Sequence, residues 1–376
     1  MADSSQDAAL RWMNRAMNLA RKGEAQASPN PMVGAVLVRD GRIVGEGFHT
    51  YAGVRHAEAI ALEAAGDAAR GATLYINLEP CCHTGRTGPC TEKLIAAGVR
   101  RVAAAIPDPN PAVAGRGFKQ LRAAGIEVEI GPLQEQARRL NEAFACWITA
   151  RRPFVTLKSA LTLDGQITLP GRKGGTTHVW ITSEESRAEV QRLRHAADAV
   201  LSGLGTIVDD NPRLTDRTEL PRLRKLLRVV VDSRLRLPLR SRLVKTAAGD
   251  VLVFTTRPAD SPRARSLRRV GVEIIRVPSR GGRVDLKGVL KELGRREILS
   301  VLLEAGGTLN AAALEAGVVD KMVLFYAPRI AGTDHMRVVQ PARHRRAMPV
   351  LRDVNLRRFG PDFAVEGYLR DVYRNR

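Results

Sequence analysis

The stretches HAE at residues 56–58 and EPCCHTGRTGPC at residues 79–90 decide how this sequence is interpreted. They bring two histidines, His56 and His83, and three of the four cysteines of the chain close together in the sequence. A catalytic zinc ion uses three protein ligands and keeps a fourth position open for water. His56, Cys81 and Cys90 would supply one imidazole and two thiolates, and the two thiolates would neutralise the charge of the ion. We therefore expect a zinc site at these three residues.

Glu58 is the residue that indicates a catalytic zinc site rather than a structural one. It lies two residues from His56, too close to coordinate alongside it, but well placed to bind the metal's water and move protons. The pattern H-x-E…P-C is that of zinc-dependent nucleobase deaminases, in which a zinc-activated water displaces the amino group of a base. The alternatives are no metal, or a closed structural site with Cys82 or His83 as fourth ligand, which leaves Glu58 unexplained. Cys146 lies on an apolar helix and is expected in the core.

Composition bounds the class of protein. The length of 376 residues suggests two or three domains, and 44% hydrophobic residues are ordinary for a globular protein. Four cysteines exclude a disulfide-rich secreted scaffold. No apolar run reaches the roughly 18 residues of a membrane-spanning helix, and the opening MADSSQDAAL is acidic and polar, unlike a secretory signal peptide. We expect a soluble protein in the reducing cytoplasm, without membrane contact.

The net charge of +21 is unevenly distributed along the chain. Residues 1–150 contain 17 Lys and Arg against 15 Asp and Glu, whereas the remaining residues contain 43 against 24. This difference suggests two domains, 1–150 and 151–376, with the boundary at Arg151-Arg152-Pro153. Aromatic residues make up only 4% of the chain, whereas nucleic-acid grooves combine basic side chains with aromatic ones. We interpret the basic excess as a solvated arginine-rich surface and expect no nucleic-acid partner.

The pattern of apolar residues predicts alternating helices and strands in both parts, which is typical of α/β layer folds. In the first part we expect helices at 7–22, 56–65, 90–97, 116–124 and 132–148, and strands at 33–39, 42–48, 72–78, 100–106 and 126–130. In the second part we expect strands at 154–161, 199–203, 227–231, 250–255, 272–277, 298–303 and 321–327, and helices near 184–195, 262–270, 285–294 and 308–316. A loop is expected at 169–177.

The second part carries weaker signals. No G-x-G-x-x-G follows a strand, so a Rossmann nucleotide site is not indicated. A predicted strand ends at Glu304, and Gly306 and Gly307 then begin a helix. Glycines let the backbone approach a ligand and helix N–H groups attract anions, so this is either a phosphate site or a simple turn. Lys158 is the lone charge in the apolar strand FVTLKSAL, and a ligand-facing role is favoured because burying an unpaired lysine is costly.

The segments PNPMVGAVLV, GEGFHTYAG, HAEAIAL, LEPCCHTGRTGPC and AAIPDPNPAVAGRG, with their long Cys-x8-Cys spacing, are similar to one known deaminase domain. The segments LKSALTLDG, LRHAADAVLSGLGTIVDDNPRLTDR, VVVDSRLRLP and LLEAGGTLNAAAL are similar to its partner domain. Together they resemble the bifunctional riboflavin-biosynthesis deaminase–reductases. The resemblance runs nearly the whole length of the chain. It implies an α/β chain with a cytidine-deaminase-like three-layer domain followed by a dihydrofolate-reductase-like α/β domain.

The resemblance also implies roles for residues of the first domain. It implies zinc at the three expected ligands, proton transfer by Glu58 and a pyrimidine held by Asn30. Residues implied to hold the ribose phosphate or to line the pocket are His49, Arg86, Asp108 and Asn110. The last two lie in a PDPNP segment, where the alternative is that they only form a turn. Two positions depart from the family pattern: Cys82 stands where the family usually has serine, and Gly88 where it usually has proline. The thiol of Cys82 could compete for zinc.

For the second domain the resemblance implies NADPH as cofactor and the deaminated ribosylaminouracil phosphate as substrate. The matching positions for cofactor contacts are Ala160, Trp180, Thr206, Asp210, Ser233, Gly306 and Gly307. The matching positions for substrate contacts are Arg194, Leu214, Arg217 and Glu304. Lys158 would lie near the reacting sugar and would be catalytic together with Glu304. The alternative is that Lys158 only pairs with an acidic neighbour and Glu304 caps the following helix.

The function implied is zinc-dependent deamination of 2,5-diamino-6-(5-phosphoribosylamino)pyrimidin-4-one, followed by NADPH-dependent reduction of its ribosyl group to a ribityl side chain. A homo-oligomer is also expected. One alternative is a nucleic-acid base deaminase with an accessory basic domain, but the near-neutral first domain lacks the basic surface that phosphate backbones require. The other is a non-catalytic RNA-binding protein with structural zinc, which would bind RNA in a steeply salt-dependent manner without turnover.

Overall fold

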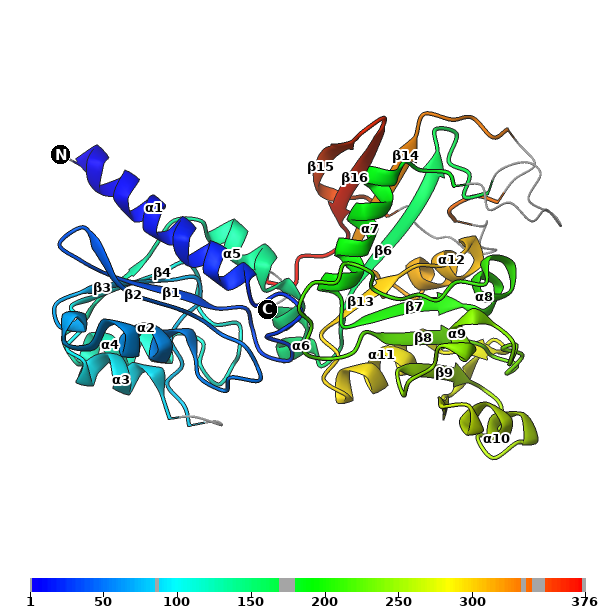
Figure 1. Ribbon diagram of the computed structural model, residues 1–376, viewed down its shortest axis with the longest axis horizontal. Helices are drawn as coiled ribbons and strands as arrows, with labels where there is room; N and C mark the ends of the chain where they lie inside the picture. The colour runs from blue at the N-terminus through cyan, green and yellow to red at the C-terminus, as the bar shows by residue number, and fades with distance from the viewer. Residues whose placement is uncertain (1, 85–87, 169–179, 333–335, 340–348, 374–376) are drawn as a thin grey trace. The chain divides into compact units, whose positions relative to one another are not determined.

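The structure, a computed structural model, describes residues 2–84, 88–168, 180–332, 336–339 and 349–373 (Figure 1). The chain divides into two compact units. The first comprises Met1–Arg151 with Pro221–Arg224 and Val372–Arg376, and the second comprises Arg152–Leu220 and Lys225–Asp371. Among the described residues, no helix is both long enough and apolar enough to cross a membrane.

The first unit is built on a five-stranded sheet in the order β2-β1-β3-β4-β5. Its strands are β1 (Gly34–Arg39), β2 (Arg42–Phe48), β3 (Thr73–Ile76), β4 (Arg101–Ala104) and β5 (Glu127–Ile130). Its helices are α1 (Ala2–Arg21), α2 (Ala57–Ala65), the 3-10 helix η1 (Gly66–Ala69), α3 (Cys90–Ala96), α4 (Arg116–Ala123), α5 (Gln134–Leu140) and α6 (Glu142–Ala150). β1 is antiparallel to β2 and β3, whereas β3, β4 and β5 are parallel.

Helices cover both faces of this sheet, which gives three layers (Figure 1). α2, α3 and α4 pack on one face through apolar residues such as Ala61 and Leu121. α1 and α5 pack on the other face, where Met13 is fully buried. Because the carboxyl ends of parallel strands share one edge of a sheet, the segments after β3 and β4 lie at the same edge. That edge carries Cys81 and Asp108.

The second unit has a nine-stranded sheet in the order β10-β9-β8-β7-β13-β6-β14-β16-β15. Its strands are β6 (Phe154–Thr162), β7 (Ala199–Gly203), β8 (Leu227–Val231), β9 (Val251–Thr255), β10 (Val272–Arg276), β13 (Ser300–Leu303), β14 (Lys321–Ala327), β15 (Arg352–Phe359) and β16 (Asp362–Tyr368), and β11 (Ser279–Arg280) pairs separately with β12 (Arg283–Val284). Its helices are α7 (Glu184–Ala196), α8 (Leu204–Asp210), α9 (Arg242–Lys245), α10 (Pro262–Arg269), α11 (Leu286–Arg295) and α12 (Gly307–Glu315). In this spatial order, each strand from β10 through β9, β8, β7, β13 and β6 to β14 is parallel to its neighbour. β16 is antiparallel to β14, and β15 is antiparallel to β16.

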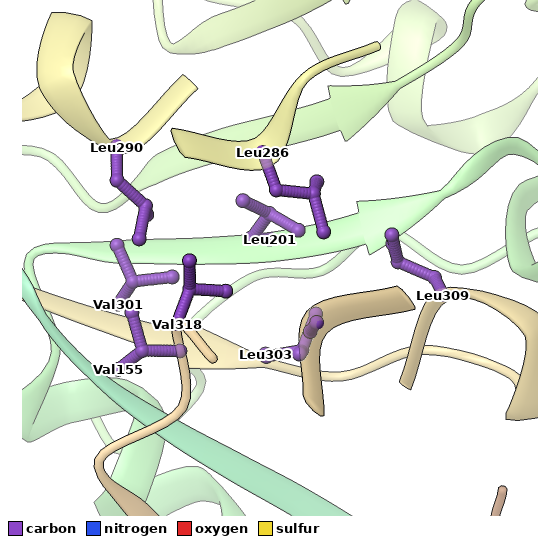
Figure 2. Close-up of a pocket in the computed structure, with 9 residues that line it drawn as sticks. Val155, Leu201, Leu286, Leu290, Val301, Leu303, Leu309 and Val318 are labelled. Atoms are coloured by element: carbon purple, nitrogen blue, oxygen red, sulfur yellow. The ribbon is translucent and has the colours of Figure 1, made fainter. Parts of the chain in front are cut away.

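Two clusters of apolar residues form most of the interior of the second unit. One joins the sheet to α11 and α12, and the other joins it to α9 and α10. Figure 2 shows a small cavity inside the first cluster, lined by aliphatic side chains that include Val155, Leu201 and Leu303. Its lining has no polar or charged side chain. The cavity is therefore part of the core and is not suited to a phosphorylated ligand.

The structure differs from the expected elements in several respects. The helix expected at 132–148 is two helices, α5 and α6, because the backbone leaves the helical conformation at Asn141 (φ −112°, ψ 19°). The hairpin of β15 and β16 was not predicted, since β15 is exposed almost throughout and rich in arginine. The short helices α8, α9 and η1 and the β11–β12 pair were also not predicted. Cys146 is buried, as expected, and the loop expected at 169–177 lies outside the described residues.

Candidate active sites

Three elements of the first unit bring the expected zinc ligands together. His56 immediately precedes α2, Cys81 lies in the segment after β3, and Cys90 is the first residue of α3. The Nδ1 atom of His56 lies 3.2 Å from the Sγ of Cys90 and 3.4 Å from the Sγ of Cys81. The ligand atoms of all three residues lie within 4.8 Å of one another.

This arrangement fits a zinc ion. Tetrahedral zinc with bonds of about 2.1 Å to nitrogen and 2.3 Å to sulfur requires its nitrogen and sulfur ligands to be roughly 3.6 Å apart. The observed separations are close to that value. Hydrogen bonding from Cys90 lowers the pKa of the Cys81 thiol, and His56 contributes further. Because thiolates bind zinc and thiols do not, the surroundings of Cys81 favour the form that binds.

Glu58 lies in the first turn of α2, and its side chain is almost completely buried. Burial raises the pKa of its carboxyl group, and the neighbouring Cys81 raises it further. Among the described residues, Glu58 is not one of the three clustered ligands, and neither are Cys82 and His83. A carboxyl group with a raised pKa beside an open metal position is suited to accept and return a proton.

Asn30 and His49 adjoin the ligand cluster. The Nδ1 atom of His49 is 2.8 Å from the carbonyl oxygen of Arg55, so this nitrogen carries the proton and donates. The Nε2 atom therefore accepts from the Nδ2 of Asn30, at 2.9 Å. The His49 ring also meets the His56 ring edge-on, with centroids 5.5 Å apart. These contacts link Asn30 to the ligand cluster through His49, and the His49 contact uses the Nδ2 atom of Asn30 and not its Oδ1 atom.

Asp108 lies beyond β4, buried at the same sheet edge. Burial raises the pKa of its carboxyl group to about 7, with contributions from the charges of Glu79, Cys81 and Glu58. Asp108 Oδ1 accepts a hydrogen bond from the backbone of Asn110, so the turn-forming role is present. Arg86, the remaining expected contact, lies outside the described residues.

Glu79 is a buried carboxylate that the sequence analysis did not single out. Its two oxygens accept hydrogen bonds from the backbone N–H groups of Asp108 (3.0 Å), Gly115 (2.8 Å) and Phe118 (3.1 Å). Glu79 thus ties the segment that carries Cys81 to the loop that carries Asp108. The motif LEPC gives no sign of this role, because the partners of Glu79 are main-chain groups 29–39 residues away in the sequence.

The second unit contains a buried cluster of charges. Glu304 follows β13, and its carboxylate accepts two hydrogen bonds from Arg194, at 2.6 and 3.0 Å. Lys158, on β6, lies 3.7 Å from the same carboxylate. Burial opposes ionisation of Glu304, but the charges of Arg194 and Lys158 outweigh it and lower its pKa to about 2. Burial lowers the pKa of Lys158.

The other expected residues of the second unit lie on several elements. Gly306 and Gly307 begin α12, Thr206 and Asp210 are on α8, Ala160 is on β6, and Leu214, Arg217, Ser233 and Trp180 lie in connecting segments. The Oγ of Ser233 accepts a hydrogen bond from Val284, and the backbone of Arg217 donates one to Gln191. Among the described residues, no side chain caps α12 at Gly306, so its first turn suits a phosphate group.

Comparison with known proteins identifies both units. Residues 6–106 match the model of the cytidine and deoxycytidylate deaminase zinc-binding region, and residues 153–365 match the RibD C-terminal domain. The second match alone covers more than half of the chain. The chain belongs to the RibD family.

Individual RibD proteins agree with this assignment. Riboflavin biosynthesis protein RibD of Aquifex aeolicus is 42% identical over 322 residues, which is 85% of this chain and 87% of that protein. The Escherichia coli RibD is 38% identical over 93% of this chain and 96% of its own length. The solved structure of Acinetobacter baumannii RibD has a TM-score of 0.83 at 34% identity, covering 96% of this chain and 99% of that one.

A further solved structure, from Thermotoga maritima, has a TM-score of 0.82 at 36% identity and covers 97% of this chain and 99% of its own. It is described as a diaminohydroxyphosphoribosylaminopyrimidine deaminase/5-amino-6-(5-phosphoribosylamino)uracil reductase. Membership of the RibD family confirms the predicted fold and the bifunctional deaminase–reductase that uses zinc and NADPH. It also sets aside the two alternatives, a nucleic-acid deaminase and an RNA-binding protein.

Proposed function

We propose that this chain deaminates 2,5-diamino-6-(5-phosphoribosylamino)pyrimidin-4-one and then reduces the ribosyl group of the product with NADPH to a ribityl side chain. The observation that carries this proposal is the presence of two different chemical clusters. The first unit has a ligand set for zinc beside a buried carboxyl group, and the second has a buried Lys158–Glu304–Arg194 cluster. A small phosphorylated pyrimidine that carries both an amino group and a ribosyl group is a substrate for both.

In the first unit, zinc held by His56, Cys81 and Cys90 would supply a Lewis acid that activates water. The carboxyl group of Glu58 accepts a proton from the attacking water and delivers it to the departing amino group, which leaves as ammonia. Its buried position raises its pKa, and a raised pKa makes both transfers possible at neutral pH. Asn30 holds the pyrimidine ring beside the ligand cluster.

In the second unit, NADPH would bind with a phosphate at the start of α12 and would supply the hydride. Lys158 binds a sugar hydroxyl and assists opening of the ribose ring, which exposes an electrophilic carbon. Glu304, fixed by two hydrogen bonds from Arg194, holds the polar substrate and stabilises the positive charge that develops. The buried setting of this carboxylate strengthens that interaction.

The test uses the intact chain and its Glu58→Gln variant. We expect the parent to release ammonia from the diaminopyrimidinone precursor and then to consume NADPH. Glu58→Gln keeps the shape but cannot accept a proton, so it should retain zinc, lose ammonia release by about 10²-fold or more and still reduce substrate that is already deaminated. Equal loss of both reactions would contradict two separate sites, and a parent that releases no ammonia would contradict the proposal.

Two further expectations belong to this proposal. We propose a cytoplasmic enzyme, consistent with four free cysteines, including the pair that would ligate zinc. We also propose a homo-oligomer that binds small phosphorylated pyrimidines and no nucleic acid. Light scattering of the purified chain, together with titration against RNA at low salt, would test both statements.

A further inference from the structure

Asn141 is a buried amide with an unusual set of partners. It lies between α5 and α6 with 2% of its surface exposed. Its Oδ1 atom accepts a hydrogen bond from the backbone N–H of Met32 at 2.8 Å, and its Nδ2 atom donates one to the carbonyl oxygen of Met32 at 3.0 Å. Asparagine at the start of a helix ordinarily caps that helix, but among the described residues this side chain makes no capping bond to α6.

A second buried amide binds the same main-chain segment. Asn77, at the end of β3, has none of its surface exposed. Its Nδ2 atom donates to the Met32 carbonyl at 2.8 Å, and its Oδ1 atom accepts from the backbone N–H of Gly34 at 2.9 Å. The peptide groups on both sides of Met32 are therefore held by side chains from two distant parts of the first unit. Four hydrogen bonds from two side chains, Asn141 and Asn77, hold the main chain of this segment in place.

This segment leads directly to the candidate active site. Asn30 is two residues before Met32, and its amide is bonded to His49, whose ring lies against His56. Through Met32, the position of Asn30 relative to the zinc ligands depends on Asn141. An apolar side chain of the same volume at position 141 would fill the space but would leave the Met32 N–H group without its acceptor.

We propose that Asn141 is a positioning residue for the deamination reaction, acting through the Met32 peptide to hold Asn30 against the substrate pyrimidine. The proposal rests on the deaminase function proposed above. Asn141 itself does not touch the reacting atoms. The break between α5 and α6 falls at Asn141, and its amide binds the Met32 backbone and makes no capping bond to α6.

The test is a double-mutant cycle with Asn30. We expect Asn141→Leu to raise the KM for the diaminopyrimidinone precursor at least tenfold, with zinc content and reduction of deaminated substrate unchanged. In an Asn30→Ala background, where the positioned group is absent, the same change should alter KM less than twofold. Asn141→Asp keeps the acceptor for the Met32 N–H group, so its KM should lie between those of the parent and Asn141→Leu.

Asn310 provides a matched control in the second unit. It is also fully buried and donates hydrogen bonds to two carbonyl groups, those of Ala305 and Val338. Asn310→Leu should leave the KM for deamination unchanged, because it removes a buried amide from the other unit. This variant distinguishes an effect specific to the Asn141 amide from a general effect of removing a buried amide anywhere in the chain.

Three outcomes would overturn the role of Asn141. The first is an Asn141→Leu protein with the parent KM, and the second is an equal increase of KM in the parent and the Asn30→Ala backgrounds. If Asn141→Leu does not fold, the third is an Asn141→Asp protein with the parent KM. The parent chain assayed alongside distinguishes this failure from a failure of the proposed function. A parent that releases no ammonia contradicts the function, whereas an active parent with unaffected variants contradicts only the positioning role.

Discussion

At the scale of single residues, the zinc ligands were the most predictable feature of this chain. The side chains that bind a metal must be of particular types, and His56, Cys81 and Cys90 stand at recognisable spacings in the sequence. Asn77, Glu79 and Asn141 could not be found in the same way. Their partners are main-chain groups, which every residue has, so neither the type nor the spacing of the partners leaves a pattern.

The neighbouring cysteines provide a test of the ligand set. Cys90→Ser removes a thiolate from the cluster, so we expect zinc content and deaminase activity to fall together. Cys82→Ser should be nearly silent, because Cys82 is outside the cluster and burial raises the pKa of its thiol. Zinc per chain measured by elemental analysis, beside ammonia release, checks both. A Cys90→Ser protein with full zinc, or a Cys82→Ser protein that loses it, would show that the ligands are wrongly assigned.

Lys158 is the residue that tests the reductase cluster. Lys158→Met keeps much of the packing of the side chain but removes the charge beside Glu304, whose carboxylate would still be held by Arg194. We expect NADPH-dependent reduction to fall at least tenfold, about 1.4 kcal/mol of barrier, with ammonia release unchanged. Reduction of the deaminated substrate at the parent rate would show that Lys158 serves only to pair with Glu304.

At the scale of elements, the alternation of strands and helices could be predicted, but the break at Asn141 and the β15–β16 hairpin were among the features that could not. The apolar pattern continues through residues 132–148, and nothing local indicates that Asn141 leaves the helix to bind Met32. The hairpin of β15 and β16 was missed because β15 is an edge strand, exposed almost throughout. Such a strand has no buried face and therefore little apolar alternation to mark it.

The close approach of α4 to the zinc-ligand segment provides a test at this scale. A Cβ atom on Gly117 would lie 2.3 Å from the carbonyl oxygen of Pro80, so Gly117→Ala must displace either α4 or the segment that carries Cys81. We expect weaker zinc binding, lower deaminase activity and unchanged reductase activity. Gly88→Ala is the control, since a Cβ there meets nothing within 4 Å among the described residues. Equal zinc affinity in both variants would mean that α4 accommodates the methyl group.

At the scale of the whole molecule, the two units have separate sheets and separate cores. The free energy of unfolding of each unit should therefore depend on its own ligand. Ligands stabilise only the folded unit that binds them. We expect a chelator to lower the unfolding temperature of the first unit alone, and NADPH to raise that of the second alone. Scanning calorimetry of the intact chain would resolve both. A single transition that shifts as one with either ligand would contradict this independence.

The basic excess of the second unit is partly explained by internal bonding. Arg228 is 1% exposed and binds Asp250 together with the carbonyl groups of Arg213 and Thr246. Arg268, on α10, binds the carbonyl groups of Ala259 and Ile274. These guanidinium groups satisfy main-chain acceptors within the second unit. A count of charges in the sequence does not distinguish such internally bonded arginines from exposed ones. For that reason we interpreted the whole basic excess as a solvated surface.

The anchoring of the Asp108 loop by Glu79 has a consequence for amide-proton exchange. Loops without regular secondary structure usually open easily, and their amide protons exchange with solvent quickly. Here the N–H groups of Asp108, Gly115 and Phe118 all end on one buried carboxylate. All three share one acceptor group, and Glu79 stands two residues before Cys81 in the chain. We therefore expect the amide protons of this loop to exchange in the same cooperative opening as the segment of the zinc ligands, although the loop contains no strand and only the start of a helix.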